Sequence, residues 1–138
     1  MSMIDLVKQS PGPVRLSVPA QPGFTHVIRS VAASVAARHG LRLDAVDEIR
    51  LVVDEAAALL LDVHAPAHAF TLVIATRPAS FDALLSTDAQ AADWPPPGVE
   101  ESWAWRVVSG LADEARFDFS EKGEPGIRIV KRLVPASE

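Results

Sequence analysis

The segment spanning residues 49–59, IRLVVDEAAAL, contains the residues whose chemistry stands out most in this chain. It places a carboxylate pair, Asp54 and Glu55, inside an otherwise apolar helix. Such a pair can serve in acid–base chemistry, or it can lie on the exposed edge of the helix. The segment alone leaves both interpretations open.

The histidine spacing and the absence of cysteine restrict the kinds of metal site and catalysis that the chain can support. His64 and His68 are four residues apart, the spacing of two metal ligands on one helical face, but Pro66 between them disfavours a regular helix. We therefore expect turn or surface histidines and no metal site. The chain has no cysteine, which excludes disulfides, zinc fingers and thiol catalysis. It also has no nucleophile elbow, Walker loop or dinucleotide fingerprint.

Length and composition indicate one globular domain. The chain has 138 residues, of which 49% are hydrophobic and 22% charged, and its formal net charge is −5. The longest apolar run, residues 56–61, falls far short of the roughly 20 residues that a membrane span needs. No signal-peptide pattern opens the chain, and the negative charge argues against direct nucleic-acid binding. We expect a cytoplasmic protein with no membrane partner.

The elements that position these residues follow from hydrophobic periodicity. Residues 1–13 read as a flexible N-terminal lead, and residues 14–134 as a single domain. The patterns predict strands at 14–18, 69–76, 81–86, 115–120 and 127–134, and helices from 24 to Gly40, from a cap at Asp44 to 61, and at 103–111. A long proline-containing loop covers 87–101. This order predicts an α+β two-layer sandwich, with about three helices covering one face of a mixed or antiparallel sheet.

Each predicted helix has an apolar stripe. The first comprises Phe24, Val27, Ile28, Val31 and Val35, and the second comprises Val46, Ile49, Val53, Ala56 and Leu60. In the third helix Trp103 lies on the stripe and is expected in the core. Trp105 lies off the stripe and Trp94 lies in the proline loop. The sequence does not decide whether these two anchor a partner or pack inward.

The ordered set of segments resembles a known family. Asp54-Glu55-Ala56 on the second helix, residues 105–114 (WRVVSGLADE) and residues 126–133 (GIRIVKRL) are similar to motifs of one branch of the GHKL, or Bergerat-fold, ATPases. This branch comprises anti-sigma factors and serine-protein kinases of the RsbW kind, and the chain looks closest to its divergent, actinobacterial-type members. The resemblance covers residues 14–134 and implies the histidine-kinase-like ATPase fold.

The sequence departs from this family where nucleotide would bind. The magnesium-binding asparagine of the family falls at Leu59, and leucine offers no oxygen to a hard cation. Asp88 matches the adenine-contacting aspartate, but alanines replace the glycines that follow it in the family. Glu55 matches the glutamate that would act as general base in a kinase. The resemblance therefore implies a degenerate nucleotide site at Glu55 and Asp88, with ATP and magnesium in doubt.

The departures at the nucleotide site leave the partner-binding arginine of the family in place. The family arginine that contacts both the sigma factor and its antagonist falls at Arg29, which the helical register turns toward solvent. An exposed arginine suits bidentate pairing with a partner carboxylate. The resemblance thus implies an anti-sigma factor that sequesters an alternative RNA polymerase sigma factor and is released by an anti-anti-sigma factor, and it suggests a homodimer.

Two alternatives remain open from the sequence. The first is an active serine/threonine kinase that uses ATP and magnesium to phosphorylate the antagonist, with Glu55 as base. The second is a degenerate GHKL scaffold for some other partner, because function belongs to sites and not to folds.

Overall fold

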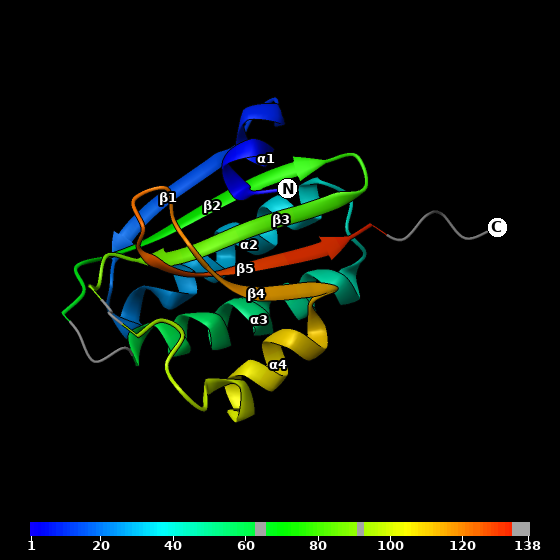
Figure 1. The fold of residues 1–138 in the computed structure, drawn as a ribbon. Coiled ribbons are helices and arrows are strands. Elements are labelled where there is room, and N and C mark those ends of the chain that lie inside the picture. Colours follow the sequence, from blue (N-terminus) through cyan, green and yellow to red (C-terminus); the bar gives the residue numbers. More distant parts are fainter. Residues whose placement is uncertain (63–65, 91–92, 134–138) are drawn as a thin grey trace.

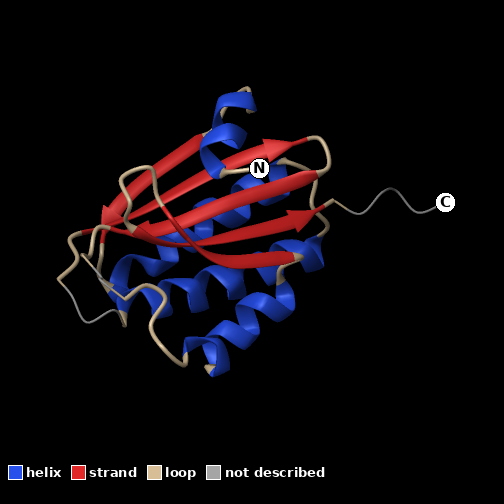
Figure 2. Ribbon diagram, in the orientation of Figure 1, coloured by secondary structure: helices blue, strands red, loops and turns tan. Residues whose placement is uncertain are grey.

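The computed structural model describes residues 1–62, 66–90 and 93–133. These residues form an α+β sandwich of two layers, in which a five-stranded antiparallel sheet has the order β1-β2-β3-β5-β4 (Figure 1). Helices α2, α3 and α4 cover one face of the sheet, and the short α1 lies on the other (Figure 2). The two-layer α+β architecture predicted from the sequence is confirmed, with a sheet that is wholly antiparallel within the described residues.

The helices and strands follow the predicted order with one addition at the N-terminus. Their bounds are α1 Met3–Gln9, β1 Val14–Pro19, α2 Thr25–Arg38, α3 Leu43–Leu61, β2 Ala69–Arg77, β3 Ser80–Thr87, α4 Trp103–Leu111, β4 Glu114–Phe119 and β5 Pro125–Arg132. Two short 3₁₀ turns, Pro22–Phe24 and Val99–Glu101, precede α2 and α4. No helix in the described ranges combines the length and apolar character that crossing a bilayer requires.

The sheet presents a different set of side chains to each layer. The core lies between the helices and the sheet, where α3 contributes the largest set of buried side chains, namely Val46, Ile49, Val52, Val53, Ala56, Ala57 and Leu60. Strand β3 lies at the centre of the sheet and is buried along its whole length. Strands β1 and β4 form the two edges, and β4 alternates outward charges with inward apolar residues.

Helices α2 and α3 pack side by side, joined by a tight connection. Gly40 has a φ of +99°, a conformation that favours glycine, and it ends α2 as predicted. The buried face of α2 is built around Ile28 and the alanines at 32, 33 and 36, while the predicted valine stripe lies half-buried on its flank. The small alanine side chains let the two helices approach closely. Asp44 is not the cap of α3, because the helix begins one residue earlier and Arg42 occupies the N-cap.

Helix α1 is an element that the sequence analysis missed. The expected lead-in, residues 1–13, contains this seven-residue helix, whose Ser2 side chain caps the first turn by accepting the N–H of Asp5. Met3 and Leu6 are buried against Ala75 and Leu84 on the face of the sheet opposite the large helices. Two buried side chains in seven residues are too few to show a helical period, which is why the pattern gave no signal.

Candidate functional site

Arg29 and Asp54 join helices α2 and α3 at their outer surface. Nη1 of Arg29 donates to both carboxylate oxygens of Asp54, at 3.0 Å each, and the side chains are 37% and 34% exposed. The sequence analysis expected Arg29 to point to solvent; its side chain does lie at the surface, but its guanidinium is partly buried and held by Asp54. The reason is that Arg29 follows the buried Ile28, which turns it toward the neighbouring α3.

The contact with Asp54 uses only part of the hydrogen-bonding capacity of the Arg29 guanidinium. Only Nη1 of Arg29 hydrogen-bonds within the part of the chain that the structure describes, whereas the group carries five N–H donors in a fixed fork. On α3, Leu51 and Ala58 lie one turn before and after Asp54 and are exposed, Leu51 by 53%. We call Arg29, Leu51, Asp54 and Ala58 the α2/α3 surface. It combines an oriented cation with exposed apolar atoms.

Glu55 is half-buried beside Asp54 but turned about 100° from it around the helix. No hydrogen bond or ion pair to its carboxylate is found among the described residues. Leu59 follows one turn later and lines an open hollow of about 510 Å³ between the end of α3 and the start of α4. The other described residues that line it are Ala58, Leu61, Asp62, Ser102 and Ala104.

This hollow does not fit a magnesium ion. Magnesium requires near-octahedral oxygen coordination, and the hollow offers the carboxylate of Asp62 and the hydroxyl of Ser102. That hydroxyl is already used, because it donates to the carbonyl of Val99 and accepts the N–H of Trp105. In residues 1–62, 66–90 and 93–133, no group of three or more histidine or acidic side chains is arranged to hold a metal. His64 lies outside these residues.

Asp88 serves the fold directly after β3. Its Oδ1 accepts the backbone N–H groups of His68 at 2.7 Å and of Ala69 at 3.1 Å, which ties the end of β3 to the start of β2. These hydrogen bonds, that from His68 above all, hold the pKa of the Asp88 carboxyl below its ordinary value. The aspartate predicted to contact adenine is thus committed to the backbone of its own chain through one oxygen.

Within the part of the chain that the structure describes, the residues assigned to a nucleotide site border different hollows. Asp88 borders an open depression of about 570 Å³ with Ala89, Gln90 and the turn at 122–125, and Leu59 borders the separate hollow between α3 and α4. Glu55 is among the described lining residues of neither. The C-terminal ends of α3 and β3 lie at the same end of the molecule (Figure 1), but Leu59 and Asp88 border different hollows there.

The loop before α4 is fastened by Trp94. Its ring is 8% exposed, its Nε1–H donates to the carbonyls of Asp118 at 3.2 Å and of Gly126 at 3.1 Å, and it meets Phe117 edge-on. Trp105 stacks on the same Phe117, with ring centroids 4.0 Å apart. Both undecided tryptophans therefore pack inward.

Trp103 was expected in the core, and this prediction is wrong, because its side chain is 75% exposed. It is the first residue of α4, and it lies five residues before the buried Val108, which puts it well away from the packed face.

Comparison with known proteins adds no identification. No protein-family model matches this sequence, and no curated protein matches it significantly. The function must therefore be argued from the geometry above and from the sequence motifs.

Proposed function

We propose that this chain is an anti-sigma factor of the GHKL type, which binds an alternative RNA polymerase sigma factor and releases it to an anti-anti-sigma factor. The proposal rests mainly on one observation, the contact of Arg29 with Asp54. The family resemblance assigns Arg29 to partner binding. Asp54 holds the guanidinium in place by Nη1, which lowers the entropy lost on binding. The remaining N–H groups stay available for a carboxylate of the partner.

The order of elements supports the same proposal. The two-layer α+β sandwich has its main helices and strands in the order predicted from hydrophobic periodicity, and this order is compatible with the fold that the resemblance implies. A likeness in layout is weaker than a match between side chains, so the fold assignment remains part of the proposal. The homodimer is also part of this proposal, and sedimentation equilibrium would test it.

Binding is favoured over catalysis by the state of the nucleotide residues. Leu59 supplies no ligand for magnesium, and one carboxylate oxygen of Asp88 already accepts the backbone N–H groups of residues 68 and 69. Phosphoryl transfer depends mainly on positioning and on charge stabilisation by the metal, and these side chains provide neither. The kinase alternative is tested by calorimetric titration with ATP and magnesium. Saturable binding followed by phosphorylation of the antagonist would overturn the assignment as a binder alone.

The main test uses the sigma factors of the source cell as individually purified proteins. We expect one of them to bind the chain and to lose transcription activity in its presence. Arg29→Ala should weaken this binding at least about tenfold, the effect of losing a charged hydrogen bond. Arg38→Ala is the matched control, since Arg38 is an exposed arginine at the end of the same helix.

Asp54→Asn separates a binding role from a structural one. If Arg29 binds the partner, a weaker hold by the neutral amide leaves binding within a few-fold of the wild type, while Arg29→Ala weakens it at least about tenfold. If the ion pair merely joins α2 to α3, the two variants will reduce binding and stability alike. Failure of every sigma factor to bind the intact, folded chain would reject the proposal.

A further inference from the structure

The face of the sheet opposite the three large helices carries an unusual pair of charges. Arg116 on β4 and Arg128 on β5 are directly opposite each other in the antiparallel register, so their side chains rise from the same face. Like charges in this position are destabilising. A cross-strand pair of arginines therefore needs nearby negative charge to be tolerated.

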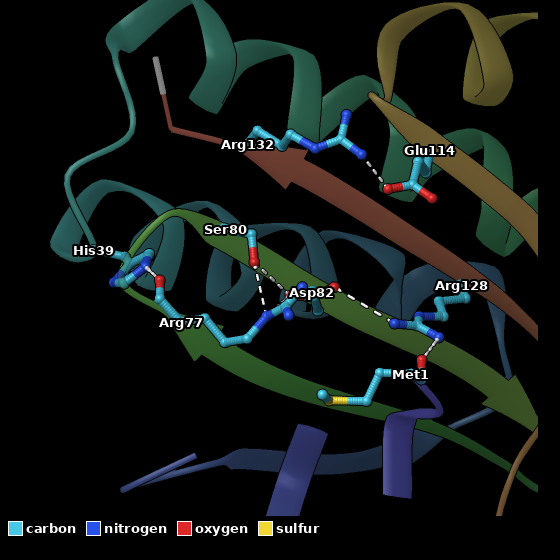
Figure 3. Close-up of polar contacts among 8 residues, drawn as sticks. All are labelled: Met1, His39, Arg77, Ser80, Asp82, Glu114, Arg128 and Arg132. Carbon is cyan, nitrogen blue, oxygen red and sulfur yellow. Dashed lines mark hydrogen bonds and ion pairs between the residues drawn. The ribbon is translucent and has the colours of Figure 1, made fainter. Parts of the chain in front are cut away.

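Arg128 is almost completely buried although it is charged. It is 6% exposed, its Nη1 donates to the carbonyl of Met1, and its Nη2 lies 3.6 Å from Oδ1 of Asp82 (Figure 3). Its Nε–H has no hydrogen-bond partner among the described residues. A buried donor without an acceptor is unfavourable, so this guanidinium has unused capacity to bind an oxygen.

The carboxylates nearby are already matched by other groups. Asp82 is fully buried, accepts the hydroxyl of Ser80 at 2.8 Å, and lies 3.5 Å from Nε of Arg77. Glu114 pairs with Arg132 at the edge of the sheet (Figure 3). Arg77 and Arg128 thus share the one carboxylate of Asp82, and no ion pair of Arg116 is found among the described residues.

These side chains enclose a hollow of about 210 Å³, which Met1 and Val130 also line. We call it the Arg128 hollow. A guanidinium fork matches the paired oxygens of a carboxylate or a phosphate group.

We propose that the Arg128 hollow binds a small oxyanion, the carboxylate or phosphate group of a small molecule. The anion would lie between Arg116 and Arg128, accept the free Nε–H of Arg128, and relieve the repulsion between the two guanidinium groups. This site is on the opposite face of the sheet from the α2/α3 surface, so it is independent of the proposed sigma-factor contact.

The test is a titration of the full chain with inorganic phosphate and, separately, with malonate, at constant ionic strength set by chloride. The readout is the NMR resonance of the Arg128 Nε–H, assigned by its loss in Arg128→Lys, together with the thermal unfolding midpoint. We expect a saturable shift of the resonance and a higher midpoint. The two titrations distinguish a phosphate ligand from a carboxylate ligand by which anion binds more tightly.

One variant and one matched control make the result decisive. Arg116→Gln alters an exposed side chain, so the chain should fold, and its affinity for the anion should fall at least about tenfold. Arg106→Gln changes an exposed arginine of α4 and should bind as the wild type does. Shifts that fail to saturate at tens of millimolar anion, or equal losses in the two variants, would show general charge screening and overturn the proposal.

Discussion

The two faces of the sheet are held by different physics. On the face toward α2, α3 and α4, most contacts are apolar, with Phe70, Leu72 and Ile74 of β2 fully buried against the helices. The ion pair of Lys131 with Glu48 is the main polar addition there among the described residues. On the face toward α1, a small apolar cluster adjoins the buried ion pair of Asp82 and Arg128. Apolar burial is non-directional and tolerates small changes, whereas a buried charge must be matched atom by atom. The first face therefore fixes the fold, and the second retains groups with unfilled bonding capacity.

The largest effect is expected on the charged face. Asp82→Ala leaves the buried guanidinium of Arg128 without its carboxylate and should lower the free energy of unfolding by about 3–5 kcal/mol. Urea denaturation measures this loss. The double variant Asp82→Leu with Arg128→Met replaces the pair by apolar groups and should recover most of it. A double variant no more stable than Asp82→Ala would show that apolar packing cannot replace the ion pair there.

A comparable but smaller loss is expected on the apolar face. Ile49→Ala removes a side chain that is 1% exposed and should cost about 2–5 kcal/mol, through lost burial and the cavity left behind. Leu51→Ala, on the outer side of the same helix, should change stability by less than about 0.5 kcal/mol. The same urea experiment compares them, and similar losses in the two variants would contradict the described orientation of α3.

Truncation under α1 should act locally. Leu6→Ala removes the fully buried side chain that fastens α1 to the sheet and should cost about 2 kcal/mol, the lower end for this substitution, because a terminal helix can detach alone. Hydrogen exchange should quicken in residues 3–9 and remain slow in β3. Quickened exchange throughout the sheet would mean that α1 is integral to the core.

The smallest effect is a pH dependence at the end of β3. Because hydrogen bonds depress the pKa of Asp88 in the folded chain, its contribution to stability is complete above the ordinary carboxyl value of 3.8 and is lost as pH falls through the folded pKa. Asp88→Asn keeps an acceptor oxygen but loses the charge. The stability difference between wild type and variant should therefore be constant near neutrality and shrink below about pH 4. A difference unchanged down to pH 2 would contradict this role.

Much of the fold was predictable because its periods are long and clear. Nineteen residues of α3 repeat the helical spacing several times, and β1 and β2 are bounded by proline, glycine or a turn, so their existence and type followed from pattern alone. Helix α1 left only one signal, the capping pair Ser2 and Asp5, whose side chains hydrogen-bond to each other. A capping pair before a single turn of apolar residues is weak evidence for a helix, because so short a helix depends on its packing against the sheet.

The side-chain pairs of the candidate sites were less predictable. Trp103 and Trp105 are two residues apart in a nine-residue helix, which is too short for the pattern to decide which of them faces the core. The contact of Arg29 with Asp54 depends on how α2 and α3 are rotated about their axes, and that of Asp82 with Arg128 on the pairing of β3 with β5. Such contacts are set by tertiary packing, which no local period reports.

The alternating pattern of strand β4 also affects how the molecule behaves beside its own copies. As an edge strand it leaves backbone groups without a neighbouring strand, and an exposed edge of this kind can template growth into aggregates. Glu114, Arg116 and Asp118 place a charge at every second position along it. A strand from another copy would have to desolvate these charges before it could pair with β4. The charges therefore oppose edge-to-edge aggregation at high concentration.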